Sequence, residues 1–418
     1  MIMNRIYIFF VLIFFIYGCS SSDRIDSEIF SSFREIGSPA SPNSGQPYLF
    51  PGADGQIYMS WMEPGIEKKH AFRFTTFDGN GWGEPHTIIE GNEFFVNWAD
   101  VPSVFQSKDE TLAAHWLESS GEWIFAYDVR MSLSEDGGLT WSQPMMPHRD
   151  GTQTEHGFAS FFNHPGGGIG IAWLDGREAE EADAASGDHA HGGDWNMHLR
   201  STNILSSNQL ADERVLDNKV CECCPTAAAE TRDGILIAYR NRSDEEIRDI
   251  YLVRYANGTW SEPYPVHDDG WQIAGCPVNG PALVSDGDRV ALAWYTGADN
   301  NSRVYVSFSR DRGRTFERPY RLNEGVALGR VAVEMLDDRS ALVMWIEVEE
   351  EDAGLMIRRV FPDGTVGAVE KIATVSDDRS SGFPRMARID DTILFVWVDT
   401  FDGSNVKTAV ARLRESID

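Results

Sequence analysis

The chain has 418 residues, with 65 acidic against 36 basic side chains and a formal net charge of −29. A surface this acidic repels phosphate backbones, so we expect no nucleic-acid partner. The length allows either two ordinary domains or one large closed β architecture, and internal repeats decide between them.

The first residues indicate processing and export rather than folded structure. Residues 6–18 form an apolar run that is typical of a secretory signal and too short to span a bilayer. The run ends in Ile-Tyr-Gly-Cys at residues 16–19, which resembles a bacterial lipobox. We therefore expect a lipoprotein signal peptide over residues 1–18 and a tether over residues 19–32. Lipidation of Cys19 would anchor the exported chain to the outer membrane; the alternative is an ordinary secretory signal with a chance cysteine.

An aromatic residue recurs at the end of a short apolar strand at intervals of 51 to 66 residues. These seven aromatic markers are Trp61, Trp116, Trp173, Tyr239, Trp294, Trp345 and Trp397. A turn signal such as Asp-Gly or Gly-Gly precedes most of them by six to eight residues, which is typical of hairpins. The regular placement predicts that the markers pack in the core. Antiparallel strands repeated at a fixed period predict propeller blades.

The end of the chain indicates how such a ring would close. The last repeat ends after its third strand, near Ala411, and residues 33–36 supply a candidate fourth strand from the other end of the chain. Pairing the two would leave no open sheet edge. The sequence therefore predicts an all-β, seven-bladed β-propeller of four-stranded antiparallel blades over residues 33–418, with six blades as the alternative.

Two turns share the pattern S-x-D-x-G-x-T followed by Trp or Phe, at residues 134–141 and 309–316. In each, the Asp carboxylate can accept backbone N–H groups of the turn and the aromatic ring can pack between neighbouring sheets. The motif resembles the Asp box of the BNR, sialidase-like propellers, and the resemblance covers nearly the whole chain after residue 32. It implies a glycan-binding or glycoside-hydrolysing propeller, exo-sialidase-like if it is an enzyme, although sialidases have six blades.

In a propeller, the loops after the marker strands and the loops leading into each blade share one face, where we expect a site at the mouth of the funnel. Glycosidases need carboxyl groups in different roles, and the candidates for acid or nucleophile are Glu118, Glu155 and Asp175. A guanidinium group binds the carboxylate of an anionic sugar bidentately. The candidate ligand-binding residues are Arg177, Arg240, Arg242, Arg330, Arg385, His156 and Asn279. The alternative for the arginines is pairing with the abundant acids to hold the loops together.

Four cysteines follow Cys19 in the chain: Cys221, Cys223, Cys224 and Cys276. An even number in an oxidising compartment favours disulfides. No cofactor is expected on that interpretation. The competing interpretation is a transition-metal site in which these thiolates are joined by His156 or by His189 and His191. It favours a different kind of function, a metal-handling protein or a non-enzymatic scaffold with a periplasmic protein partner.

Overall fold

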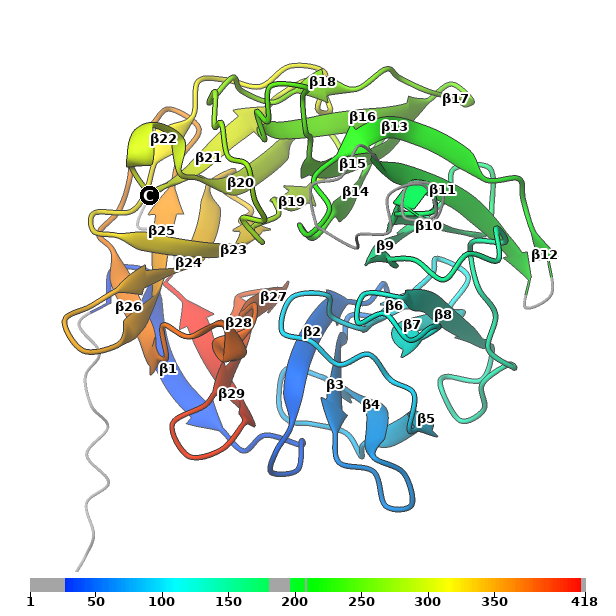
Figure 1. The fold of residues 1–418 in the computed structure, drawn as a ribbon. Coiled ribbons are helices and arrows are strands. Elements are labelled where there is room, and N and C mark those ends of the chain that lie inside the picture. The colour runs from blue at the N-terminus through cyan, green and yellow to red at the C-terminus, as the bar shows by residue number, and fades with distance from the viewer. Residues whose placement is uncertain (1–26, 180–195, 207–208, 415–418) are drawn as a thin grey trace, which may run out of the picture.

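The computed structural model describes residues 27–179, 196–206 and 209–414. Seven antiparallel sheets stand around a central axis, as Figure 1 shows, so the predicted seven-bladed propeller is confirmed. The described helical segments include two single 3₁₀ turns, η1 (Ala298–Asn300) and η2 (Arg379–Ser381), and Glu178 and Ala179 are also helical. Within the described ranges, no helix combines the length and the apolar character that crossing a membrane requires.

The blades follow one another along the chain, each beginning with its innermost strand. Blade one has β2 (Gly45–Pro51), β3 (Ile57–Glu63), β4 (His70–Phe77) and β5 (His86–Gly91). Blade two has β6 (Ser103–Gln106), β7 (Leu112–Ser119) and β8 (Tyr127–Ser134). Blade three has β9 (His156–Asn163), β10 (Ile169–Asp175), β11 (Met197–Ser206), β12 (Gln209–Leu210) and β13 (Arg214–Val220).

The remaining blades continue the same order. Blade four has β14 (Ala227–Thr231), β15 (Gly234–Arg240), β16 (Ile250–Ala256), β17 (Thr259–Trp260) and β18 (Tyr264–Pro265). Blade five has β19 (Ala282–Ser285), β20 (Val290–Thr296), β21 (Arg303–Ser309) and β22 (Tyr320–Arg321). Blade six has β23 (Ala327–Met335), β24 (Ala341–Val348), β25 (Ala353–Val360) and β26 (Glu370–Val375). Blade seven has β27 (Arg385–Ile389), β28 (Thr392–Asp399), β29 (Asn405–Leu413) and β1 (Phe30–Ile36).

Blade seven closes the ring with strands from both ends of the chain. Strand β1 pairs antiparallel with β29, in a register that sets Phe33 opposite Ala411 and Ile36 opposite Thr408. This is the closure predicted from the missing fourth strand of the last repeat, and β1 begins three residues earlier than expected, at Phe30. Because the first and last segments share one sheet, the ring closes without leaving an unpaired edge at that point.

Three blades depart from the four-stranded pattern. In blade two, the outermost strand is reduced to an isolated bridge between Met131 and Met145. In blade three both β12 and β13 pair with β11, and in blade four both β17 and β18 pair with β16. The departures are confined to the outer edges of the blades, away from the axis.

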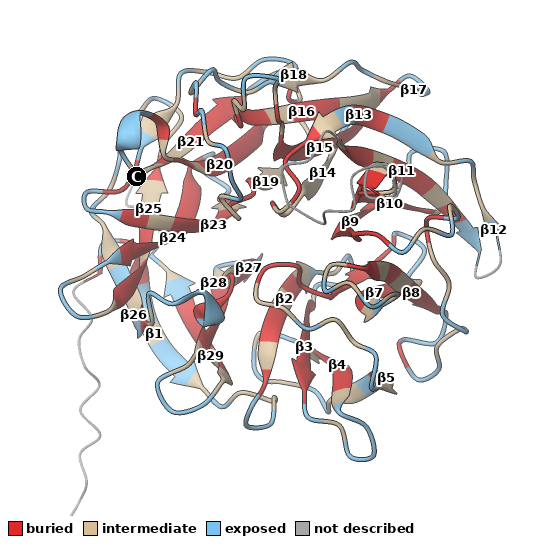
Figure 2. Ribbon diagram, viewed as in Figure 1, coloured by how far each residue is buried: buried red, intermediate tan, exposed pale blue. Residues whose placement is uncertain are grey.

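The hydrophobic core lies between neighbouring blades. Figure 2 shows buried residues along the middle strands of the blades and exposed residues on the outer loops. Among the described residues, seven clusters of buried apolar side chains correspond to the seven contacts between adjacent blades. All seven aromatic markers are at most 3% exposed, as the repeat pattern predicts. The innermost strands instead line a central channel with a cavity of about 350 Å³.

The two S-x-D-x-G-x-T turns form the contacts expected of them. Asp136 accepts hydrogen bonds from the backbone N–H of Thr140 at 2.9 Å and from its hydroxyl at 2.6 Å. Asp311 accepts the equivalent pair from Thr315 at 2.9 and 2.7 Å. The ring of Trp141, which ends the first turn, packs edge-on against Phe74 of the preceding blade. The first turn therefore ties blade two to blade one.

Candidate functional site

A pocket of about 570 Å³ lies among loops that lead into blades two to five and loops that follow the marker strands. The apolar residues that line it are Phe95, Trp98, Phe125, Phe158 and Val278. The polar residues that line it are Tyr127, Glu155, Glu222, Cys223, Arg242, Glu246, Arg248, Cys276 and Arg379. A concave surface with an apolar wall and a few convergent polar groups is the usual form of a small-ligand site.

The polar wall of the pocket holds a buried phenol between two carboxyl groups. The hydroxyl of Tyr127 donates a hydrogen bond of 2.8 Å to Oε1 of Glu155 and lies 3.4 Å from Oδ2 of Asp100. Asp100 also accepts the backbone N–H of Phe158 at 2.8 Å. Tyr127 opens β8 of blade two and Glu155 immediately precedes β9 of blade three. The interface between two blades therefore assembles this group.

Burial sets the protonation of the three groups. Removal from water raises the pKa of Glu155 well above its usual range, and the nearby charge of Asp100 adds to the effect. Burial also raises the pKa of Asp100 to about 7 and that of Tyr127 well above 10. Burial therefore favours the protonated form of Glu155, whose carboxyl group is held against a neutral phenol. A carboxyl group in this state can act as a proton donor.

Two arginines of the pocket are neutralised by two glutamates. Arg242 bonds Glu222 and, at 2.6 Å, Glu246. Arg248 bonds the same two carboxylates, at 2.6 and 2.9 Å. Both guanidinium groups are almost fully buried. The salt-bridge network of these four residues is therefore a rigid part of the pocket lining.

A further cation lies at the rim of the pocket. Arg379 is exposed, and no other described residue forms an ion pair with it. Its guanidinium carbon lies 5.8 Å from the ring centre of Trp98, which also contacts Arg330 at 5.1 Å and stacks on Phe383. The position of Trp98 is thus fixed from several sides, and Arg379 is the pocket cation placed to meet an anion from solvent.

Two of the predicted catalytic carboxylates make a contact that repeats from blade to blade. Asp175 accepts the indole N–H of Trp173 at 2.8 Å, and Glu118 accepts that of Trp116 at 2.8 Å. The same contact links Trp61 to Glu63 and Trp345 to Glu347. In four blades the carboxylate two residues after the marker therefore satisfies the buried indole. Among the three predicted carboxylates, Glu155 is the one that lines the pocket.

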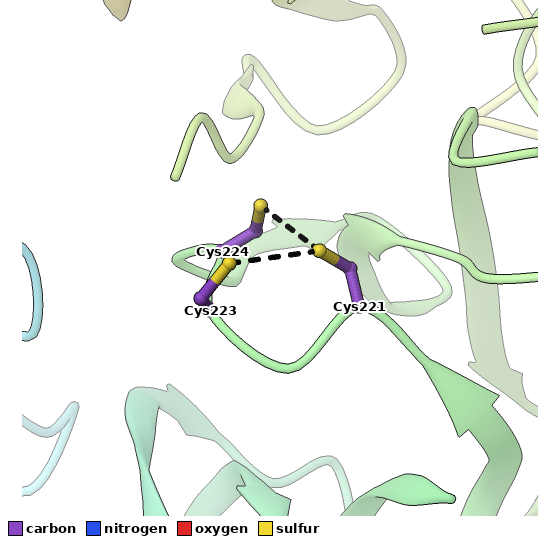
Figure 3. A group of neighbouring side chains, drawn as sticks. All are labelled: Cys221, Cys223 and Cys224. Atoms are coloured by element: carbon purple, nitrogen blue, oxygen red, sulfur yellow. Dashed lines mark hydrogen bonds between the residues drawn. The ribbon is translucent and has the colours of Figure 1, made fainter. Parts of the chain in front are cut away.

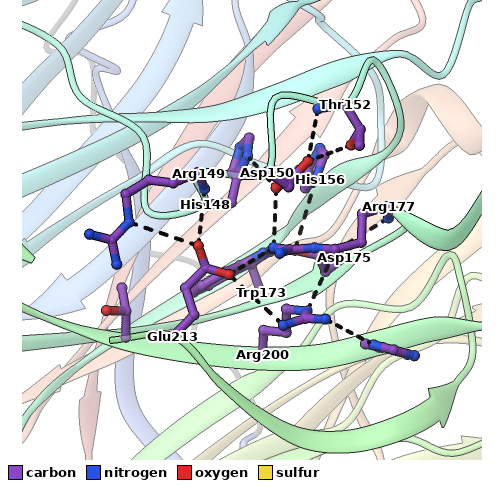
Figure 4. A network of polar contacts seen from close by, with 12 residues as sticks. His148, Arg149, Asp150, Thr152, His156, Trp173, Asp175, Arg177, Arg200 and Glu213 are labelled. Atoms are coloured by element: carbon purple, nitrogen blue, oxygen red, sulfur yellow. Dashed lines mark hydrogen bonds and ion pairs between the residues drawn. The ribbon is translucent and has the colours of Figure 1, made fainter. Parts of the chain in front are cut away.

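Asp175 also belongs to a network of polar contacts at the end of blade three, shown in Figure 4. Arg177 bonds both oxygens of Asp175 at 2.6 Å and reaches Glu213 at 2.8 Å and Asp150 at 3.1 Å. The Nε atom of Arg200 lies 3.6 Å from Oδ1 of Asp175. Arg177 was predicted to bind a ligand, but in the structure its guanidinium group forms ion pairs with three acidic residues of this network.

His156 lies in the same network, stacked on His148. The two imidazole rings are 3.8 Å apart and parallel to within 3°. Burial lowers the pKa of both rings, but hydrogen bonding to Asp150 and the charge of Asp175 outweigh it and raise the pKa of His156. A metal ion in the plane of one ring would lie far from the plane of the other, so the stacked pair does not fit one shared ion. The arrangement fits an imidazolium stacked on a neutral imidazole.

The remaining predicted ligand-binding residues lie apart from the pocket. Arg240 donates to the backbone carbonyls of Asn279, Arg248 and Tyr295 at 2.6 to 2.9 Å. Arg330 donates to the Ser381 hydroxyl at 2.6 Å, and its backbone N–H donates to Asn279 at 2.7 Å. These contacts join the loops leading into blades five, six and seven.

Arg385 lines the central channel rather than the pocket. Its guanidinium carbon lies 5.1 Å from the ring centre of Tyr48 and 5.9 Å from that of Phe383. Burial lowers its pKa. The five predicted arginines thus divide among a salt-bridge network, backbone carbonyls, the pocket wall and the channel.

The cysteine loop does not contain the disulfides that the sequence favours. Cys221, Cys223, Cys224 and Cys276 are all free in the structure. The Sγ atom of Cys221 lies 3.3 Å from that of Cys224 and 3.9 Å from that of Cys223 (Figure 3). Arg248 donates to the Cys221 sulfur at 3.2 Å. Burial raises the pKa of Cys221, but the hydrogen bonds of the cysteine loop and the Arg248 charge outweigh it, so the thiolate is favoured at this position.

The structure brings together residues that the sequence analysis did not join. Cys223 and Cys276 line the pocket together with Glu155 and Arg242. His156, a proposed metal partner of the cysteines, belongs to the Asp150 network instead, and His189 and His191 lie outside the described residues. Tyr127 was missed, because a tyrosine at the start of a repeated strand carries no signal that separates it from core aromatics.

No family model matches the chain, and no curated protein matches it. Among solved structures, the chain is similar to a polysaccharide lyase of family PL25, an ulvan lyase bound to -[GlcA(1-4)Rha3S]-, with 13% identity and a TM-score of 0.54 over 92% of this chain and 98% of the lyase. It is also similar to the NanB sialidase of Streptococcus pneumoniae, with 12% identity and a TM-score of 0.45 over 92% of this chain and 71% of the sialidase. At this identity the first likeness shows the fold. The resemblance to sialidase-like propellers is therefore confirmed at that level.

Proposed function

We propose that this chain binds an acidic sugar of a glycan in the 570 Å³ pocket and hydrolyses its glycosidic bond. The observation that carries the proposal is the hydrogen-bonded pair of Tyr127 and Glu155 in the pocket wall. Burial raises the pKa of Glu155 and so favours its protonated form, and glycoside hydrolysis needs such a group to protonate the leaving oxygen.

In this proposal Glu155 gives its proton to the glycosidic oxygen as the bond to the anomeric carbon breaks. Water then supplies the hydroxyl group to the sugar, and the released proton restores Glu155. Tyr127 occupies Oε1 of Glu155 with its own hydrogen bond, so the phenol fixes the orientation of the carboxyl group. Tyr127 is therefore a positioning residue for the proton donor.

The charges of the pocket favour an anionic sugar. The charges of Glu222 and Glu246 are balanced by ion pairs with Arg242 and Arg248. Glu155 carries no charge in its protonated form. This leaves the exposed Arg379 as the pocket cation that forms no ion pair with the described residues, and a guanidinium group suits a sugar carboxylate or sulfate. The apolar wall offers Phe95 and Phe158 to the C–H faces of the ring. A lyase that shares the fold is bound to -[GlcA(1-4)Rha3S]-, which supports a glycan ligand.

Binding is tested separately from hydrolysis by titrating the protein with glycans that end in sialic or uronic acid. We expect saturable binding that Arg379→Ala weakens about tenfold, the effect of losing about 1.4 kcal/mol. Arg310→Ala, an exposed arginine in the turn of blade five, serves as the control. Equal binding of neutral and acidic glycans, or no loss in Arg379→Ala, would contradict an anion-binding role for this pocket.

We also propose that the chain is exported and anchored to the outer membrane through Cys19. The apolar run and the residues around Cys19 support this. Metabolic labelling with palmitate should modify the wild type and leave Cys19→Ala unlabelled and released from the membrane fraction. Labelling that persists in Cys19→Ala would contradict the anchor.

A further inference from the structure

The loop between β13 and β14 gathers three cysteine side chains at one point. Figure 3 shows Cys221, Cys223 and Cys224 with their sulfur atoms turned toward one another. The sulfur of Cys221 is 3.3 Å from that of Cys224 and 3.9 Å from that of Cys223, and all three lie within 4.8 Å of one another. Cys221 and Cys224 are each only 1% exposed, whereas Cys223 also lines the pocket.

We propose that Cys221, Cys223 and Cys224 form a three-thiolate site for a thiophilic d¹⁰ metal ion, Cu(I) or Zn(II). This site is separate from the Tyr127–Glu155 pair and does not depend on the proposed hydrolysis. Sulfur atoms that share such an ion lie roughly 3.8 to 4.0 Å apart, given a metal–sulfur bond of about 2.3 Å. The observed separations are close to this range, so binding would require little movement of the loop.

The number of converging sulfur atoms favours a metal ion over a disulfide. The sulfur atoms of three cysteines converge at this point. A disulfide bond between any two of them would leave the third cysteine as a buried or half-buried free thiol. A thiophilic ion uses all three, because thiolate is the ligand that selects Cu(I) and Zn(II). Cys276 of the next loop is exposed and its side chain interacts with Cys223, but it does not belong to the group of three sulfurs that lie within 4.8 Å of one another.

The surroundings also suit an anionic metal–thiolate group. Arg248 donates to the sulfur of Cys221 at 3.2 Å from the same Nη1 that bonds Glu222 at 2.6 Å. The backbone N–H of Cys221 bonds the carbonyl of Arg240 at 2.9 Å, which fixes the start of the loop on blade four. A charged hydrogen-bond donor on a ligating sulfur is the kind of outer contact that orients metal ligands.

The test is metal titration of the full mature chain, purified with thiols reduced and without chelator, using competing chromogenic chelators for Zn(II) and for Cu(I) in separate arms. We expect one ion per chain in at least one arm, and a loss of affinity on the order of 100-fold or more in Cys221→Ser and in Cys224→Ser. Cys276→Ser, which removes the exposed thiol beside Cys223, is the comparison and should lose much less affinity than either of these variants. Binding of neither ion, or equal loss in Cys276→Ser, would overturn the proposal.

Because the buried variants could lose their fold, a second measurement uses the wild type alone. Co(II) added to the wild type should give the thiolate-to-cobalt charge-transfer absorption of three sulfur ligands, and Zn(II) should raise the melting temperature by linkage. The absence of both effects, with no rise in melting temperature on adding Cu(I) either, would overturn the proposal. So would a Cys221–Cys224 disulfide found by non-reducing peptide mapping of the protein taken from its own compartment.

Discussion

The phenol of Tyr127 donates a 2.8 Å hydrogen bond to Oε1 of Glu155, so a residue of blade two holds a carboxyl group that precedes blade three. Asp100, which leads into blade two, lies on the other side of the same phenol. A small change at the contact between these blades would therefore alter the proton donor directly. The proposed chemistry depends on how two blades pack.

Removal of the Tyr127 hydroxyl should lower the rate of hydrolysis more than it weakens glycan binding. In Tyr127→Phe the ring still stacks on Phe95, but Glu155 loses the bond that orients it. We expect kcat to fall roughly 10- to 100-fold, corresponding to one lost hydrogen bond of about 1.5 to 3 kcal/mol, with KM little changed. Tyr305→Phe in blade five is the control. A matched fall in binding would instead assign Tyr127 to ligand contact.

Asp100 should make the protein less stable as the pH rises. Its pKa is about 7 in the folded chain and about 3.8 when unfolded. Between pH 3.8 and pH 7, Asp100 therefore keeps its proton in the folded state and has lost it in the unfolded state. The free energy of unfolding falls as the pH rises through this range. The shift corresponds to a loss of up to about 4 kcal/mol.

The variant Asp100→Asn tests this account of pH dependence, because an amide can still accept the N–H of Phe158 and does not ionise. Relative to the wild type, the variant should gain stability between pH 4 and pH 7 in chemical denaturation. Parallel stability curves for the two proteins across this window would show that Asp100 does not titrate as described.

Asp175 should matter for stability and not for glycan binding. It accepts the indole N–H of Trp173 and both contacts from Arg177 while fully buried. Asp175→Ala leaves these partners uncompensated, and we expect a loss of about 3 to 5 kcal/mol in the free energy of unfolding. Glu118→Ala, at the equivalent but more exposed position of blade two, should cost about 1 kcal/mol. Loss of glycan affinity in a folded Asp175→Ala protein would place Asp175 in the ligand site.

The closing strand should be needed for a soluble ring. Deleting residues 1–37 removes β1 and exposes the edge of β29, which pairs with it from Phe30 to Ile36. We expect a lower melting temperature and aggregation through the open edge, since unpaired strands recruit other chains. Deleting residues 1–26, which keeps the whole of β1, is the control. A monomeric, equally stable protein without residues 1–37 would contradict this role of β1.

Most of the fold could be predicted from the sequence because its signals are local and repeated. Trp61, Trp173 and Trp345 recur in one register, and each sits in the same buried position of its blade. The closing strand was predictable because the last repeat lacks one strand and the first residues supply it. The repeat Trp-x-Glu/Asp was also visible, and it could have identified Glu118 and Asp175 as partners of buried indoles.

The site could be predicted only in part, because it depends on contacts between loops of different blades. Glu155 was among the predicted carboxylates, but its partner Tyr127 lies 28 residues earlier, with no pattern to link the two. Arg242 and Arg177 have the residue type that binds anions, yet the structure pairs them with acids of other loops. Which arginine remains unpaired, Arg379 in this pocket, follows from loop conformation and not from composition.

The most direct test of the proposed function is to compare the wild type with Glu155→Gln on a panel of acidic glycans, following both hydrolysis and binding. The account predicts that the wild type releases the terminal acidic sugar, and that Glu155→Gln binds with similar affinity but hydrolyses at least about 100-fold more slowly, because the amide cannot protonate the leaving oxygen. Equal rates of hydrolysis in the two proteins, or a wild type that releases no sugar from any of these glycans, would contradict it.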